Sequence, residues 1–510
     1  MLGFLRRNYL SIDPRTLGLL RIGMACLLLL DLAKRVPVLR LFYVNEGLIP
    51  NHRVLWRPPR EFSFSYLLSL SSVGEVQVAF VLIALIYLCF LVGFRTRLMH
   101  VLSWLSLISL HARVDILSSG ADFVFGELLL WSAFLPLGRR FSIDALMRTD
   151  PDRVWRDTEP VVSLAVLALI MQLAVIYFFN TVHKSGVTWR EGTAVYWLVH
   201  QERIVTLLGH WAREALPLWF FQALTYMTLV IEGALPVLLL SPWGRPWTRR
   251  LALLCIIVLH TGMALMSNLG VFSPTMMVYG LCLIEARDWE LWAALGDRRP
   301  GLQLARFIER KCEQIIRQLG LVPGGPTSQP ASPVVRRAGF WLSQVAVSLL
   351  ILVATSQVLV ENPAIPDWLE HRPPRAVRAA IGYLRLNQGW SMFAPDAPRD
   401  DLWVVVDAVT SDGRHVDPWN ELASRIADPS LRTIPARLGQ DAAHCDYTSR
   451  IPDDDILHEP FRDWILAYHR RTRRPEDRIV RFRAYVIEQH SPAPDESAPS
   501  DVRARMFLKM

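Results

Sequence analysis

The chain has 510 residues, of which 52% are apolar, and it carries a formal net charge of +8. Its positive mean hydropathy of +0.25, with charged residues clustered between apolar blocks, excludes an ordinary soluble protein for most of the length and indicates a polytopic membrane protein. The excess arginine lies in loops, where positive charge sets membrane orientation, so it predicts no nucleic-acid partner.

Nine apolar runs follow one another along the chain. Most of them approach the roughly twenty residues that a helix needs to cross a bilayer, so we expect an all-α polytopic membrane helical bundle of about nine spans. The third, fourth and eighth runs are short, which predicts tilted or re-entrant helices there. The runs cover residues 16–33, 76–94, 98–112, 120–137, 161–182, 216–240, 250–268, 270–286 and 338–360.

The distribution of arginine between the loops predicts the orientation of this bundle. Loops on the side of the N-terminus hold roughly twice as many basic residues as loops on the other side, and cytoplasmic loops carry such an excess. We therefore expect an integral, multi-pass membrane protein with a cytoplasmic N-terminus and a C-terminal domain outside. Lys184, which follows the fifth run, then lies on the outer side.

Composition divides the chain into four parts. Residues 1–290 hold eight of the apolar runs, and residues 338–362 form the last membrane helix. Between them, residues 291–337 combine a basic amphipathic segment, expected on the inner membrane surface, with a flexible linker rich in proline, glycine and serine. Residues 363–510 are more polar and predict a small extramembrane domain.

The pattern of this C-terminal part is typical of a mixed α+β domain. LWVVVDAVTSDGRHVDPW predicts a strand, a Ser-Asp-Gly turn and a second short strand, and RIVRFRAYVIEQ alternates like a further strand. Residues 461–473 suit a helix, whereas SPAPDESAPSD has the composition of a disordered segment.

Several polar residues lie inside the apolar runs, where a charged side chain is costly and marks a functional candidate. Each either forms an interhelical hydrogen bond or ion pair, or lines a cavity that holds a polar ligand. We treat them as candidate cavity residues and keep interhelical bonding as the alternative. They are Arg21, Glu127, Gln172, Glu232 and His260.

The sequence shows no motif of a soluble enzyme and no metal site. It lacks a glycine-rich phosphate loop, a GxSxG elbow and an HExxH helix. Its 6 cysteines show no CxxC pairing and its 13 histidines are scattered, so no metal is predicted.

Residues 177–192, YFFNTVHKSGVTWREG, bring polar and aromatic side chains together at the mouth of the fifth run. They include His183, Lys184 and Trp189 beside a glycine turn. A lysine in this position is either an interfacial cation that reaches the lipid headgroups or an amine held away from water. In the second case burial lowers its pKa and makes it available as a base, with Trp189 as a further cavity residue.

This stretch resembles the corresponding part of the vitamin K-dependent γ-carboxylase and its bacterial relatives, the HTTM (horizontally transferred transmembrane) family. The resemblance covers about residues 13–290 in order. QGWSMFAPDAP, at residues 388–398, resembles the segment that follows the last span in bacterial members. The other matching pieces are LGLLRIGMACLLLLDL, LFYVNEGLIP, GFRTR, SSGADFVFGELLLWSAFLPLG, FSIDA, and His260 with Asn268 and Phe272.

The resemblance implies a chemistry for Lys184. In the carboxylase, the matching lysine is the base that deprotonates reduced vitamin K; reaction with oxygen then leads to an epoxide and to removal of a glutamate γ-proton, and carbon dioxide is captured. For this chain it implies a quinol-dependent oxygenase or carboxylase-like enzyme with Lys184 as base beside His183. Reduced vitamin K or menaquinol is the expected cofactor. The expected partners are the lipid bilayer, a lipid quinone and a peptide or protein substrate.

The chain also departs from the carboxylase pattern. His183 stands where the carboxylase has a second lysine, and Ala121 and Asp122 stand near the position of a histidine that it uses. Residues 363–510 offer no match to its substrate-docking region. These departures leave a second hypothesis open, in which a non-catalytic HTTM membrane protein binds or handles a lipid, a peptide or a partner protein.

Overall fold

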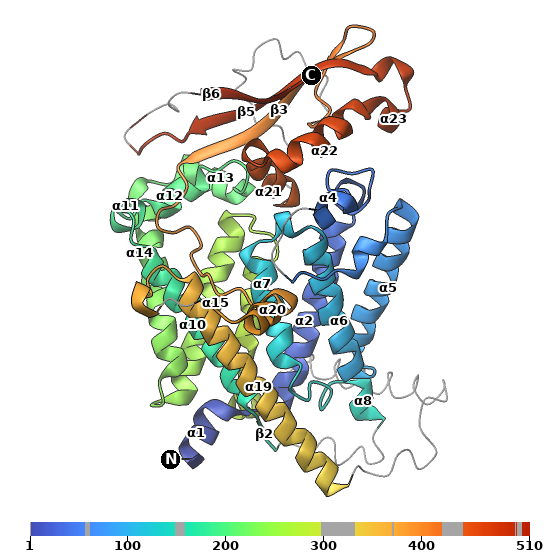
Figure 1. Cartoon of the computed structure of the whole chain (residues 1–510). Helices are drawn as coiled ribbons and strands as arrows, with labels where there is room; N and C mark the ends of the chain where they lie inside the picture. Colours follow the sequence, from blue (N-terminus) through green and yellow to red (C-terminus); the bar gives the residue numbers. More distant parts are fainter. Residues whose placement is uncertain are drawn as a thin grey trace.

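The computed structural model describes residues 2–56, 62–147, 159–296, 332–369, 372–420, 442–494, 496 and 502–510. It shows a helical bundle with a sheet-containing unit packed on one end (Figure 1). Most of the expected amphipathic segment and linker, at residues 297–331, lies outside the described residues.

Among the described residues, six helices are long and apolar enough to cross a membrane. They are α2 (Pro14–Arg35), α5 (Val73–Val92), α10 (Leu164–His183), α14 (Leu218–Leu240), α15 (Arg245–Met266) and, through Arg337–Glu361, α19 (Pro333–Glu361). Shorter helices connect them: α1 (Leu2–Leu5), α3 (Leu39–Phe42), α4 (Asn51–Trp56), α8 (Ile143–Leu146), α11 (Val187–Arg190), α12 (Ala194–Val199), α13 (Leu207–Ala215), α17 (Ala286–Gly296) and α20 (Arg375–Leu384). Further single turns are η1 (Arg6–Leu10), η2 (Tyr66–Ser69), η3 (Asp115–Leu117), η4 (Leu281–Leu283) and η5 (Asp367–Leu369).

The three runs that the sequence marks as short form short helices. They are α6 (Thr96–Arg113) with 18 residues, α7 (Gly120–Ser132) with 13 and α16 (Phe272–Gly280) with 9. Residues 121–132 of α7 are all buried, so this helix packs within protein and does not need the full length of a lipid-facing span. The N-terminus and the sheet lie at opposite ends of the bundle (Figure 1).

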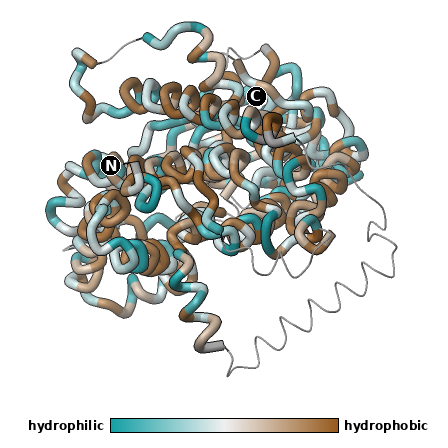
Figure 2. The backbone as a smooth tube through the Cα atoms, turned by 90° about the horizontal axis from the view of Figure 1, so that it is seen from below, coloured by the Kyte–Doolittle hydropathy of each residue, from teal (hydrophilic) through white to brown (hydrophobic). Residues whose placement is uncertain are grey.

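The long helices divide into interior and perimeter helices. In α2 and α10, 61% and 67% of the apolar window is buried, against 22–28% in the other four. On α5, the exposed side chains Val78, Val81, Leu82 and Leu85 recur at helical spacing. Apolar residues accordingly occur on helices at the perimeter as well as inside the bundle (Figure 2), as a lipid-facing surface requires.

Arg21 is a buried structural cation in this bundle. Its Nη1 donates to the carbonyl oxygens of Phe90 and Leu91 at 3.0 Å each, and its Nη2 donates to the carbonyl of Phe141. Arg21 thereby satisfies carbonyls that the last turn of α5 leaves open. The helix ends at Gly93, whose φ of +71° and whose closeness to the guanidinium both exclude a larger residue.

The C-terminal unit is built on a four-stranded antiparallel sheet in the order β4-β3-β5-β6. Its strands are β3 (Asp400–Thr410), β4 (His415–Val416), β5 (Ile479–His490) and β6 (Val502–Lys509); a separate pair joins β1 (Ser11–Ile12) to β2 (Val161–Val162). The helices and turns are α21 (Ala442–Arg450), η6 (Ile451–Asp453), α22 (Asp455–Leu466), α23 (Tyr468–Thr472) and η7 (Pro475–Asp477). Strands β3, β4 and β5 fall where the sequence predicts them, and β6 is an additional strand. The helix expected at residues 461–473 is divided between the second half of α22 and α23, because α22 begins six residues earlier and ends at Leu466.

Buried aromatic side chains hold the helices of this unit against the sheet. Trp419 stacks on His444 at 4.0 Å between ring centroids and meets Phe461 edge-on at 5.5 Å. Asp401 at the start of β3 ties the sheet to the membrane helices, because its Oδ2 accepts a hydrogen bond from Glu202 N at 2.6 Å. Burial raises the pKa of this carboxyl to about 6, although Arg203 opposes the shift.

The segment between α20 and β3 returns into the bundle before it reaches the sheet (Figure 1). Gln388 is fully buried there and joins two helices, since Gln172 Nε2 donates to its Oε1 and its Nε2 donates to Glu127 Oε1, both at 2.9 Å. Trp390 Nε1 also donates to Gln388 Oε1, at 3.0 Å. A single amide thus satisfies polar groups from α7 and α10 that would otherwise be buried without partners.

We expect Gln388→Leu to lower the melting temperature of the detergent-purified protein by several degrees. The substitution leaves Glu127 and Gln172 without this partner, and each unsatisfied buried group costs about 1–3 kcal/mol. Gln77→Leu is the matched control, because Gln77 is exposed on the lipid-facing side of α5. Equal melting temperatures for the two variants in thermal unfolding would contradict this role of Gln388.

Candidate functional site

Lys184 follows directly on the last residue of α10. The chain turns sharply here, because Ser185 N donates to His183 O at 2.8 Å and Gly186 N donates to Pro395 O at 2.9 Å. Helix α11 begins at Val187, directly after Gly186. Lys184 is only 6% exposed, so its amine points into the protein and not toward lipid headgroups.

The amine of Lys184 forms a buried ion pair with Glu232 of α14. Nζ donates to Glu232 Oε2, and the two side chains are 1% and 2% exposed. The other carboxylate oxygen, Oε1, accepts a hydrogen bond from Asn180 Nδ2 at 2.9 Å. Asn180 lies one helical turn before Lys184, so both side chains reach the same carboxylate.

Trp189 supports the amine from the other side. Its ring lies 4.5 Å from Lys184 Nζ, within the range of a cation–π contact, and its indole Nε1 donates to Phe393 O at 2.8 Å. Burial lowers the pKa of the Lys184 amine, while the Glu232 carboxylate acts in the opposite direction. The site therefore holds an amine whose charge depends on one neighbouring carboxylate.

A cavity of about 260 Å³ opens beside this ion pair. Lys184, Glu232, Arg203 and Asp446 contribute its charged groups, and apolar side chains from α10, α15 and α16 form much of the remaining wall. Such a mixture, an apolar wall with few polar groups, is typical of sites for small organic molecules. The lining residues are Ser119, Gly120, Ala121, Ile176, Tyr177, Asn180, Lys184, Arg203, Ile204, Glu232, His260, Met263, Asn268, Leu269, Gly270, Phe272, Met276, Met392, Phe393, Ala442, Cys445 and Asp446.

His260 is the second buried polar group of the cavity. Its Nε2 lies 2.9 Å from the hydroxyl of Tyr177, and the ring of Phe272 packs edge-on against it at 5.5 Å. Its Nδ1 has no hydrogen-bond partner among the described residues. The imidazole is thus held at Nε2, while Nδ1 is a buried polar atom whose hydrogen-bonding capacity the described residues leave unused.

The late segment of residues 386–398 covers the loop that carries Lys184. Asp396 Oδ1 accepts hydrogen bonds from Thr188 N at 2.7 Å and Thr188 Oγ1 at 3.0 Å, and Ala397 N donates to Thr188 Oγ1 at 2.9 Å. Met392 and Phe393 of the segment also line the cavity, as do Ala442, Cys445 and Asp446 of α21. The C-terminal part of the chain therefore contributes part of the site.

Glu232 and His260 are the predicted cavity residues that the structure brings together with Lys184. The lining residues given above do not include Arg21, which caps α5, or Glu127 and Gln172, which bond to Gln388.

The two other predicted residues are Trp189 and His183. The Trp189 ring contacts the Lys184 amine. The Nδ1 of His183, the last residue of α10, is 2.9 Å from Trp390 O. Its ring packs near Phe179, with 5.7 Å between ring centroids. Neither side chain is among the lining residues described for the cavity.

The site also contains residues that the sequence reasoning missed. Tyr177 and Asn180 lie on the face of α10 that carries Lys184, at spacings of seven and four residues, so helical periodicity could have found them. Arg203 and Cys445 come from distant parts of the chain, and no local pattern marks them.

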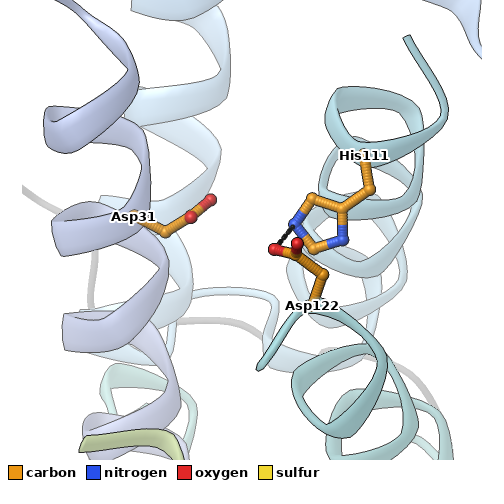
Figure 3. Close-up of side chains that lie close together, drawn as sticks. All are labelled: Asp31, His111 and Asp122. Atoms are coloured by element: carbon orange, nitrogen blue, oxygen red, sulfur yellow. Dashed lines mark ion pairs between the residues drawn. The ribbon is translucent and has the colours of Figure 1, made fainter. Parts of the chain in front are cut away.

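One further cluster has residue types that ligate metals. Asp31, His111 and Asp122 are buried with their candidate ligand atoms within 4.8 Å of one another, and His111 Nε2 lies 3.0 Å from Asp122 Oδ1 (Figure 3). Arg35 donates to both oxygens of Asp31, at 2.8 and 2.9 Å, and to Asp122 Oδ1 at 3.2 Å. Since this guanidinium supplies the positive charge between the carboxylates, we describe the cluster as an ion-pair network.

Comparison with known families gives one match. The family model for the HTTM domain matches residues 9–289, more than half of the chain, and so includes Lys184, Glu232 and His260. This confirms the family resemblance found in the sequence. Comparisons with curated proteins and with solved structures gave no significant match.

We expect Gly186→Ala to disrupt the loop that carries Lys184. A Cβ at this position would lie 2.2 Å from Asp396 Cγ, and Asp396 cannot move without losing its hydrogen bonds to Thr188. The expected cost is about 1–3 kcal/mol, as for other overpacking substitutions, and thermal unfolding measures it. Gly74→Ala is the control, because its Cβ would meet nothing within 4 Å.

The clash with Asp396 predicts a coupling between the two positions. In an Asp396→Ala background, Gly186→Ala should destabilise the protein less than it does in the native background. The same destabilisation in both backgrounds would show that another contact is responsible.

Proposed function

Because the chain belongs to the HTTM domain family, which is linked to vitamin K-dependent carboxylase-like membrane proteins, we propose that it is a quinol-dependent oxygenase or carboxylase-like enzyme with Lys184 as its base. The observation that supports this proposal best is the position of the amine. It is buried, it borders a cavity with apolar walls, and it is paired with a carboxylate that can take up its proton.

A quinol suits this cavity by its shape and by its polar ends. Ile176, Met263 and Met276 offer apolar walls to an aromatic ring, and the volume of about 260 Å³ lies just below the roughly 300–1,000 Å³ range of ligand sites. Lys184 and His260 offer two polar groups for two hydroxyls. Reduced vitamin K or menaquinol, when bound, supplies the electrons for a reaction with oxygen.

The side chains have separate roles in this proposal. Lys184 must be unprotonated to accept a proton from a hydroxyl, and Glu232 makes this possible by holding the proton that the two groups share. Asn180 keeps the carboxylate in place through its bond to Oε1. His260 binds a second hydroxyl through Nδ1, while Tyr177 fixes the orientation of its ring.

A second function remains a competing proposal. A non-catalytic HTTM protein that binds or handles a lipid, a peptide or a partner protein would use the same cavity as a binding site. The observation that favours it is that the amine already has a carboxylate partner, which is also what a purely structural ion pair requires.

We expect Lys184→Ala to reduce quinol-dependent oxygen uptake by a factor of about 10² to 10⁴, as for loss of a general base. Oxygen electrode measurements with menaquinol and with vitamin K hydroquinone, on membranes containing equal amounts of folded protein, test this. Lys509→Ala is the control because Lys509 lies on the exposed part of β6 and should leave the rate unchanged.

The two proposed functions separate in the same experiment. Glu232→Gln should lower the rate as well, since the amide cannot take up a proton. If the native protein consumes no oxygen with either quinol, the enzyme proposal fails. A lipid or protein that copurifies equally with native and Lys184→Ala chains would then support the non-catalytic proposal.

We also propose that the N-terminus is cytoplasmic and that Lys184 and the C-terminal sheet lie outside. The supports are the arginine distribution and the placement of the N-terminus and the sheet at opposite ends of the bundle. This orientation opens the site toward the outer leaflet.

Cysteine labelling in intact cells tests this orientation. A membrane-impermeant maleimide should label Ser411→Cys, in the β3–β4 turn, and should leave Ser332→Cys, before α19, unlabelled until the cells are opened. Both serines are exposed, and the native chain measures the background from its own cysteines. The reverse labelling pattern would contradict the proposed orientation and would place the N-terminus outside and the C-terminal sheet in the cytoplasm.

A further inference from the structure

A second, larger cavity lies where the membrane helices meet the C-terminal unit. Its volume is about 990 Å³, and its walls come from α4, the end of α6, η6 and α22. Helices α4 and α22 lie next to each other at the end of the bundle that faces the sheet (Figure 1). Among the residues that the structure describes, the two cavities have no lining residue in common. They come nearest in sequence at Ser118, which lines this cavity, and Ser119, which lines the cavity beside Lys184.

Arg113, the last residue of α6, is a buried cation at the wall of this second cavity. It is 0% exposed, and its Nη2 donates to Ile49 O at 2.8 Å. Its Nε and Nη1 have no hydrogen-bond partner, and no carboxylate among the described residues forms an ion pair with it. The C-terminal end of a helix offsets only a small part of the cost of burying such a charge, so an anion is expected to complete this environment.

A second arginine at the same cavity also lacks a carboxylate partner. Arg450 Nη2 donates to Ser118 O at 3.1 Å, and it forms no ion pair with the described residues. The wall carries three carboxylates: Asp115 pairs with Arg385 at 2.8 Å, Asp453 pairs with Arg505 at 2.9 Å, and Asp454 Oδ1 accepts a hydrogen bond from Ile456 N at 3.3 Å. The wall thus offers two guanidinium groups to an anion from outside the chain.

The rest of the cavity wall is suited to an acyl chain. Leu48, Val54 and Leu457 contribute apolar surface. Among the lining residues, Leu55 is 63% exposed and Ile456 is 40% exposed, although both are large and apolar. A buried cation with an exposed apolar rim, at the end of membrane helices, matches a molecule that has an anionic head and an apolar tail.

We propose that this cavity binds the phosphodiester head of a membrane phospholipid, with Arg113 as the buried partner of the phosphate and Arg450 as the second. Guanidinium groups favour phosphate because their planar donors match its oxygens. A lipid is preferred over a free phosphate ion because the cavity has a volume of about 990 Å³ and an apolar rim that an inorganic ion would leave unfilled.

Thermal unfolding of the detergent-purified full chain tests this proposal with three probes. Dihexanoyl-phosphatidylglycerol, added below its critical micelle concentration, should raise the melting temperature of the native protein in a saturable way. Dihexanoylglycerol, which has the same acyl chains without the phosphate, should not do so, and neither should sodium phosphate. Equal stabilisation by dihexanoylglycerol or by sodium phosphate would overturn the proposal.

Substitutions at the cavity wall test whether the phosphatidylglycerol probe binds in this cavity. Arg113→Gln should weaken the apparent affinity for the phosphatidylglycerol probe at least tenfold, and Arg450→Gln should weaken it less. Ile456→Trp, which enlarges an exposed lining side chain and leaves Arg113 in place, should also weaken binding and keeps the test decisive if Arg113→Gln does not fold. Arg481→Gln is the matched control, because Arg481 is exposed on β5. Unchanged affinity in Arg450→Gln and Ile456→Trp would contradict binding at this cavity.

Discussion

The ion pair between Lys184 and Glu232 is the interaction on which the candidate site depends. Removing two charges from water costs several kcal/mol for each, and their attraction offsets this cost only when the geometry is good and further bonds are made. Here Asn180 binds the carboxylate and the Trp189 ring faces the amine. The pair therefore fixes how α10 and α14 approach each other, and it keeps a reactive amine at the wall of an apolar cavity.

The late segment at residues 386–398 links this pair to the rest of the chain. Gln388 satisfies polar groups of α7 and α10 below the site, and Asp396 holds the loop after Lys184 through Thr188. The HTTM match ends at residue 289, so this segment lies outside it, yet it closes the loop and lines the cavity. The C-terminal part of the chain thus belongs to the site and is not a separate appendage.

Local patterns explain which parts of the structure the sequence could predict. The long apolar runs predict α2, α5, α10, α14, α15 and α19, and strict alternation predicts β5. Glu232 and His260 are identified as candidates near Lys184 only because a polar side chain is costly to bury inside a membrane. The partners of Arg21, Glu127 and Gln172 could not be predicted, because they lie 69 to 261 residues away and depend on how the chain folds back. Arg21 caps α5, and Glu127 and Gln172 bond to Gln388 of the late segment.

A double-mutant cycle on Lys184 and Glu232 tests the central claim most directly. Unfolding of the purified native chain, Lys184→Met, Glu232→Gln and the double variant should be compared at one detergent concentration. We expect each single change to leave a buried group without its partner, and the double change to cost less than the sum of the two by about 1–3 kcal/mol. Strictly additive effects would contradict a buried, coupled pair and with it the proposed site.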